Sequence, residues 1–166
     1  KTAGTKYVSA TGSAKTAQQS ALVTPAAMAY FTVTGIANPI TAGAAANAVV
    51  VTAYDSLDNI KTDYNGTITF ASNDPLAILP AEHTFVPAND SGTKTFSLTL
   101  KTAGSKYVSV TDASDNTGQQ IMVVAPAATS EYFINTPDDI SVGTRGAYTF
   151  TRKDQFLCAL RESGFN

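Results

Sequence analysis

The chain has 166 residues and a hydrophobic fraction of 43%, so it is long enough to bury a core. Its 11 Lys and Arg residues are outnumbered by 13 Asp and Glu residues, and the formal net charge of -2 argues against nucleic-acid binding. A single cysteine, Cys158, excludes an intrachain disulfide, and a single histidine, His83, argues against a zinc site or a Ser-His-Asp arrangement.

A repeat of about 100 residues is the most informative feature of the sequence. Residues 1–11 read KTAGTKYVSAT and residues 101–111 read KTAGSKYVSVT, which gives nine identities in eleven positions. The match extends through a linker, because residues 25–27 and 126–128 both read PAA. A period of this length is longer than the 20 to 50 residues of solenoid repeats and fits one sandwich domain per repeat.

The repeat divides the chain into three parts. We expect residues 1–27 to be the C-terminal strands of a preceding repeat, residues 28–128 to form a complete repeat, and residues 129–166 to begin the next one. The chain opens on Lys1 and has no signal-peptide pattern, which indicates a segment of a longer protein. No apolar stretch reaches the length of about 20 residues that a membrane-spanning helix needs.

Within residues 28–128 the apolar residues alternate with a period of two, which is typical of half-buried strands. Residues 93–100 give the clearest example, and residues 121–124 form a continuous apolar run that predicts a strand covered on both faces. Turn signals separate the strands. Asn65 and Gly66 predict a turn with positive φ, and residues 90–92 predict another turn. Residues 73–75 predict a strand end, and residues 112–118 predict a polar loop.

About seven antiparallel strands at this spacing predict an all-β fold, an Ig-like β-sandwich. Residues 155–162 carry apolar residues at helical spacing, but their repeat counterpart is the loop at residues 56–61, so a loop is favoured over a helix. The residues expected to point into the core are Phe31, Val33, Val49, Val51, Ile68, Phe70, Phe96, Leu98, Leu100, Val108 and Val110.

The complete repeat also resembles the Ig-like tandem repeats of large bacterial and archaeal surface proteins. The resemblance covers nearly the whole chain and is carried by VTAYDSLDN (51–59), YNGTITF (64–70), SNDP (72–75), LPA (79–81) and TFSLTLKTAG (95–104). It implies an extracellular or cell-surface location in an adhesin, stalk, sheath or filament, and it implies no catalytic residues.

A calcium site is one hypothesis for the acidic loop of the complete repeat. Asp55, Asp58, Asn59 and Asp63 lie within nine residues and carry the oxygen ligands that calcium prefers. Asx side chains also stabilise turns through bonds to their own backbone, and no EF-hand spacing is present, so turn formation is favoured and no cofactor is expected.

Two other kinds of modification site follow from short patterns. Asn65 and Asn89 begin sequences that match the N-glycosylation pattern, although chance matches are common in a chain rich in Thr. Cys158 has three alternatives: a buried apolar residue, an exposed thiol or half of an intermolecular disulfide.

Three functions from different classes follow. The favoured one is a structural or spacer module of an extracellular repeat protein or filament, whose partners are neighbouring repeats or copies of itself and which could assemble head to tail. The alternative is a binding module of an adhesin whose loops recognise a glycan or a surface protein. An enzyme is not expected, because no nucleophile with a base and no paired carboxylate motif is present.

Overall fold

The computed structural model of the chain describes residues 2–135 and 149–154. These residues form an almost entirely β structure with a single one-turn helix among them. In chain order the elements are β1 (Gly4–Thr11), β2 (Thr16–Val23), β3 (Met28–Thr34), β4 (Ile40–Thr41), β5 (Ala45–Asp55), β6 (Thr67–Ser72), β7 (His83–Thr84), α1 (Pro87–Asp90), β8 (Thr93–Thr99), β9 (Gly104–Asp112), β10 (Thr117–Ala125), β11 (Thr129–Asn135) and β12 (Thr149–Asp154).

Strands β3 to β10 form a two-layer structure that we call the central sandwich, residues 28–125. One sheet has the order β3-β5-β8 and the other the order β4-β10-β9-β6-β7. Neighbouring strands are antiparallel except for the short pair β4 and β10, in which Ile40 and Thr41 lie beside Val124 and Ala125. The predicted all-β sandwich is therefore confirmed.

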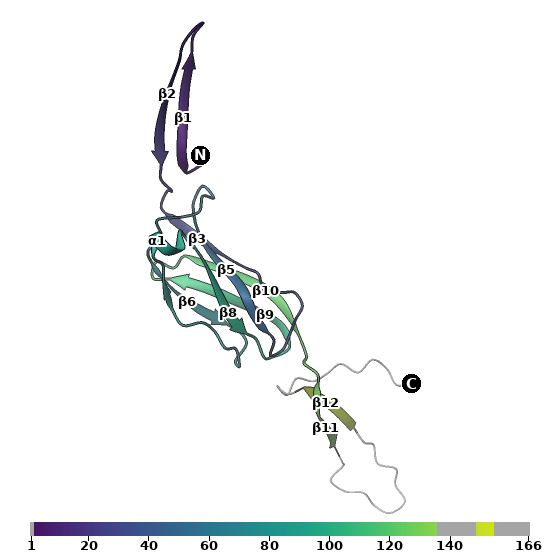
Figure 1. Ribbon diagram of the computed structural model, residues 1–166. Coiled ribbons are helices and arrows are strands. Elements are labelled where there is room, and N and C mark those ends of the chain that lie inside the picture. The colour runs from purple at the N-terminus through teal and green to yellow at the C-terminus, as the bar shows by residue number, and fades with distance from the viewer. Residues whose placement is uncertain (1, 136–148, 155–166) are drawn as a thin grey trace, which may run out of the picture.

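Two hairpins flank the central sandwich at its opposite ends (Figure 1). We call β1 and β2 the N-terminal hairpin and β11 and β12 the C-terminal hairpin. Among the described strands, β1 pairs only with β2, and β11 pairs only with β12. Cys158 and the stretch at residues 155–162 lie outside the described residues.

The hydrophobic core lies wholly inside the central sandwich. Alternating strand residues supply it from both sheets, because successive side chains of a strand point to opposite faces. Its buried members are Phe31, Val33, Ile36, Ile40, Ala42, Ala46, Val49, Val51, Ala53, Tyr64, Ile68, Phe85, Leu98, Leu100, Val108, Val110, Met122 and Val124. Nine of the eleven predicted core residues are in this set.

The two exceptions among the predicted core residues are Phe70 and Phe96, which are only partly buried. Their rings meet edge to face with centroids 4.8 Å apart at the margin of the core. The central aromatic is instead Phe85, which is 1% exposed and contacts the ring of Tyr64. Phe85 follows the two-residue strand β7, which is too short to display an alternating pattern.

Residues 121–124 correct a second expectation, because they do not form a covered strand. Ile121 is 61% exposed and Val123 is 50% exposed, whereas Met122 and Val124 are buried. The strand therefore alternates like its neighbours and leaves two apolar residues on its outer face. No described element covers that face of β10 at these residues.

The expected turn at Asn65 and Gly66 is also wrong, since neither residue has a positive φ. Gly66 is required for packing: a Cβ there would lie 2.3 Å from the hydroxyl oxygen of Tyr64. The turn at residues 90–92 does form as predicted, with positive φ at Ser91 and Gly92.

Gly118 marks the closest approach of the two sheets. It lies in β10 under β3, and a Cβ at this position would be 2.2 Å from the carbonyl oxygen of Phe31. Real Cβ atoms do not come so close to backbone oxygen, so any side chain here would force β3 and β10 apart.

Candidate functional site

The junction between the N-terminal hairpin and the central sandwich is the most organised site outside the core. The linker at residues 24–27 leads from β2 into β3, and the loop at residues 56–63 follows β5. Two hydrogen bonds join these parts: the Ala26 amide donates to Asp55 Oδ2 at 2.8 Å, and the Ala3 amide donates to Asn59 Oδ1 at 2.8 Å. Both sides of the hairpin base are thus attached to one loop.

Asp55 is the centre of this junction and is fully buried at the end of β5. Its carboxylate accepts hydrogen bonds from the amides of Leu57 and Asn59 at 2.8 Å each, and from the side-chain amide of Asn59. Burial alone raises the pKa of this carboxyl, but bonds from Asn59, Ala26 and Leu57 outweigh it and hold the pKa well below its usual range. The buried carboxylate is therefore ionised, and its hydrogen-bond donors are groups of the same chain.

The remaining calcium candidates have separate partners. Asp58 has φ of 61° and accepts a hydrogen bond from the Tyr30 hydroxyl at 2.7 Å, while Asp63 pairs with the ammonium group of Lys61 at 2.9 Å. Asn59 directs its side chain to Asp55 and Ala3. No group of three or more His, Cys, Asp or Glu residues suited to a metal ion occurs in the described part of the chain. Turn formation stays the favoured interpretation of these residues, and calcium binding stays the weaker hypothesis.

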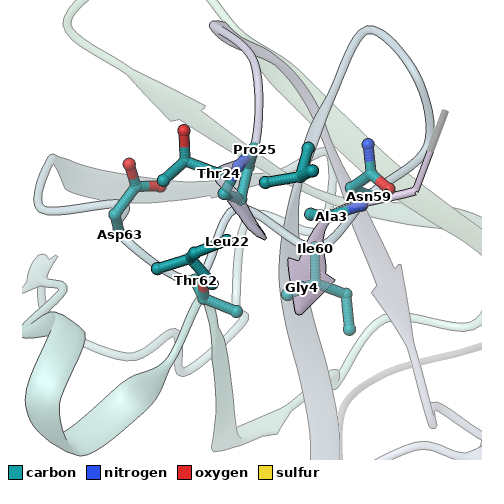
Figure 2. Close-up of a pocket in the computed structure, with 10 residues that line it drawn as sticks. Ala3, Gly4, Leu22, Thr24, Pro25, Asn59, Ile60, Thr62 and Asp63 are labelled. Carbon is teal, nitrogen blue, oxygen red and sulfur yellow. Dashed lines mark hydrogen bonds between the residues drawn. The ribbon is translucent and has the colours of Figure 1, made fainter. Parts of the chain in front are cut away.

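A cleft of about 420 Å³ lies where the hairpin base meets the loop (Figure 2). Its apolar lining comes from Leu22, Val23 and Pro25 on the hairpin side and from Ile60 on the sandwich side. A second cleft of about 540 Å³ adjoins the linker and is lined in part by Lys6 and Leu57. Leu22, Val23, Leu57 and Ile60 are exposed, so the two hydrogen bonds are the described contacts that join the two parts.

A second turn of the same design links β9 to β10. Asp112 accepts hydrogen bonds from the Ser114 amide at 2.9 Å, from the Asn116 amide at 3.0 Å and from the Asn116 side chain. Asp115 has φ of 61°, as Asp58 does. The signal in the sequence is the pattern Asp-x-x-Asp-Asn, which occurs at residues 55–59 and 112–116. The two turns differ in burial and in outside partner: Asp112 is only partly buried, and it binds the hydroxyl of Tyr64 at 3.0 Å instead of a linker amide.

Two more buried carboxylates hold loops of the central sandwich in place. Asp74 accepts bonds from the amides of Leu76, Lys101 and Thr102 and from the Thr102 hydroxyl. Burial raises the pKa of Asp74, but these bonds lower it overall. The sequence indicated a strand end here and did not indicate a buried acid.

Asp90 binds the ammonium group of Lys94 at 2.8 Å, the amide of Val86 at 2.9 Å and His83 Nε2 at 3.1 Å. The bond from Lys94 is the largest cause that lowers the pKa of Asp90, to about 2. His83 also lies edge to face against the rings of Phe85 and Phe96. These contacts give His83 a place in the margin of the core.

Both asparagines of the glycosylation patterns are exposed. Asn65 lies in the loop before β6, and Asn89 lies in α1 instead of the expected turn. Exposure is compatible with a bulky glycan at either position, and glycosylation stays a prediction. Among the described residues, no helix has the length and apolar character that crossing a membrane requires.

Comparison with known proteins gives structural matches only. No protein-family model matches the chain. No curated protein sequence matches it either. One structural match is surface layer protein SbsC, domains 4-9, with 15% identity and a TM-score of 0.44 over 96% of this chain and 25% of that one. Another is the S-layer protein rSbsC(31-844), with 14% identity and a TM-score of 0.40 over 96% of this chain and 21% of that one. The chain thus spans about a quarter of the length of the first of these structures.

Proposed function

We propose that this chain is a structural segment of an extracellular or cell-surface repeat protein, in which sandwiches of about 100 residues act as spacers. The observation that supports it is the recurrence of one hairpin: Gly4 pairs with Val23 as Gly104 pairs with Val124. The whole register of the N-terminal hairpin follows β9 and β10 in this way, with one residue fewer in its turn. A repeated structural unit keeps such register because it must pack in the same way each time.

In this proposal the chain contains parts of three repeats. Residues 1–27 are the C-terminal strands of one, residues 28–128 are a complete one and residues 129–166 begin the next. The backbone of the C-terminal hairpin supports the last assignment, because Thr129 lies opposite Asp154 as Met28 lies opposite Asp55. Both pairings have a bulge after this first pair.

A structural role, as opposed to catalysis, is supported by the way buried polar groups are used. In the part of the chain that the structure describes, every buried side-chain nitrogen or oxygen atom has a hydrogen-bond partner. Asp55, Asp74 and Asp90 each hold loop amides, so their charge organises the fold. We infer that the chain is not an enzyme.

Two measurements test the proposal. An antibody against residues 28–128 should label intact cells of the source organism as strongly as permeabilised ones, and labelling only after permeabilisation would contradict a surface location.

Proteins with one, two and three copies of residues 28–128 should increase in maximum dimension by a constant step in small-angle X-ray scattering. A compact particle whose dimension stays constant would contradict the spacer role.

Head-to-tail assembly is a second proposal, favoured by the exposed inner face of the N-terminal hairpin. Val8 is 77% exposed although its counterpart Val108 is completely buried. In the central sandwich β3 packs over β10, and the C-terminal hairpin holds the repeat counterpart of β3, so the tail of a second copy could cover this face. Light scattering should then detect oligomers whose size rises with concentration and that Val8→Asp abolishes. A monomer at every concentration would contradict this assembly.

A further inference from the structure

We infer that the turn at residues 55–59, which we call the Asp55 turn, is a docking element for the end of a preceding repeat. It holds two consecutive repeats in one fixed orientation. The junction clamp is the set of Asp55, Asn59 and the amides of Ala3 and Ala26 that they bind. This inference concerns the geometry of the junction and is independent of the cellular location of the protein.

The positions of the two bonds explain why the clamp fixes orientation. Ala3 immediately precedes β1, and Ala26 follows β2. The sandwich therefore binds the residue before β1 and the linker after β2, whereas a single covalent linker would allow the hairpin to rotate about it. Figure 2 shows Ala3 beside Asn59, with Leu22 and Pro25 near Ile60 across the cleft.

The charge on Asp55 makes its bond to Ala26 the stronger of the two, because the Asn59 side chain that binds Ala3 is neutral. Asp55 is buried and ionised, and a hydrogen bond to a charged group is roughly twice as strong as one between neutral groups. Its other bonds, from Leu57 and Asn59, hold the carboxylate in place before the linker binds. The site is therefore preorganised for the linker amide.

The turn at Asp112 provides an internal comparison. It has the same five-residue pattern and the same bonds from its third and fifth residues, but it binds Tyr64 inside the sandwich. One turn design thus has two uses, and only the copy at Asp55 contacts the preceding repeat. Variants at Asp112 can separate the effect of a weakened turn from the effect of a lost clamp.

The sequence indicates that the Asp55 half of the clamp recurs at the second junction, where Cys158 stands at the position of Asn59. The linker at residues 126–128 repeats the one at residues 25–27. Asp154 ends β12 at the register position that Asp55 has at the end of β5. The bond to the linker would then recur at successive junctions, without the bond that Asn59 makes to the hairpin base.

The test measures the distance between the hairpin and the central sandwich by pulsed electron spin resonance. Spin labels are attached after Ser13→Cys and Thr95→Cys, both at exposed positions, in the full chain with Cys158→Ser. We expect one narrow distance distribution in this parent protein. We expect Asp55→Asn to lose it, because the single side-chain oxygen of Asn remains with the amides of Leu57 and Asn59, and the nitrogen that then faces Ala26 cannot accept its bond.

The matched control is Asp112→Asn, which weakens the equivalent turn and should keep the narrow distribution. If Asp55→Asn lowers stability too far, Asn59→Ala, which removes the acceptor for Ala3, is compared with Asn116→Ala. A broad distribution in the parent protein, or equal broadening in the members of each pair, would overturn the inference. Protection of the Ala26 amide from hydrogen exchange gives a second readout, which should be lost in Asp55→Asn only.

Discussion

The N-terminal hairpin and the hairpin of β9 and β10 have the same register and nearly the same sequence in their first strands, yet only one of them is buried. Val108 and Val124 are 0% and 1% exposed, whereas their counterparts Val8 and Val23 are 77% and 42% exposed. The glycines that begin β1 and β9 even share a positive φ, of 101° and 110°. Local sequence therefore determines the hairpin, and the surrounding strands determine its burial.

This difference separates two contributions to stability. A two-stranded hairpin has little stability by itself, because it buries too little apolar surface to offset the loss of conformational entropy. In the central sandwich the same strands gain β6 on one side and β3 across the core. The N-terminal hairpin has contacts at its base only, through the junction clamp.

The largest contrast is expected when a charge replaces the equivalent valines. Val108→Asp places an unpaired carboxylate in the core and should lower the free energy of unfolding by at least about 4 kcal/mol. Val8→Asp places the same group in solvent and should leave the melting temperature of the central sandwich unchanged. Thermal melts of both variants check this, and equal losses would contradict the assigned burial.

A similar contrast is expected between aromatic residues within the central sandwich. Phe85→Ala removes a fully buried ring and should cost about 3 to 5 kcal/mol of stability. Phe96→Ala should cost less, because its ring is partly exposed. Urea unfolding measures both values, and a larger loss for Phe96→Ala would show that the margin of the core matters more than its centre.

The next effect concerns the pair of residues at the tip of each hairpin. The sandwich has Val110 opposite Gly118, and the N-terminal hairpin has Ala10 opposite Ala17. Gly118→Ala should cost about 1 to 3 kcal/mol, because the new methyl group meets the carbonyl of Phe31. Ala17→Gly should not change the sandwich melt. An unaffected Gly118→Ala variant would mean that β3 adjusts easily.

Acid should weaken the sandwich more than the N-terminal hairpin. The pKa of Asp90 is about 2 in the folded chain, below the value of about 3.9 for an unfolded Asp, so its stabilisation is complete above about pH 4 and is lost as the pH falls toward 2. Asp55, Asp74 and Asp112 shift in the same direction. Melts from pH 5 to pH 2 check this, and Asp90→Asn should flatten the curve. The hairpin turn at residues 12–15 has no carboxylate.

The smallest effect is expected from metal removal. Melts in EDTA and in millimolar calcium should coincide, because the Asp55 turn is already satisfied by protein hydrogen bonds. A large rise in melting temperature with calcium would instead identify Asp55, Asp58 and Asp63 as ligands.

The sequence predicted the strands correctly where apolar and polar residues alternate over several positions. It misled at Ile121 and Val123, because an apolar run looks the same whether one or both faces are covered. It missed Phe85 because β7 has two residues. It misassigned Gly66, whose role depends on the ring of Tyr64, a contact that no local pattern encodes.

At the junction, the sequence analysis singled out the residues that make the contacts, but it did not predict which groups they bind. Asp55 and Asn59 were candidates for a metal site, and the structure joins them to each other and to the linker. The repeated Asp-x-x-Asp-Asn pattern is the signal that identifies a turn design. The linker contact could not be predicted, because it depends on how the linker lies against the loop in three dimensions.

The parallel pair of β4 and β10 has a mechanical consequence. The chain enters the central sandwich through β3 and leaves it through β10, and the two flanking hairpins lie at opposite ends (Figure 1). A pull along the chain therefore slides β4 and β10 past each other along their length. Their backbone bonds, with the bond from Ala42 to Ala125 at 2.7 Å, are loaded together instead of one after another. In the proposed repeat protein, we expect tension to load this short patch in shear.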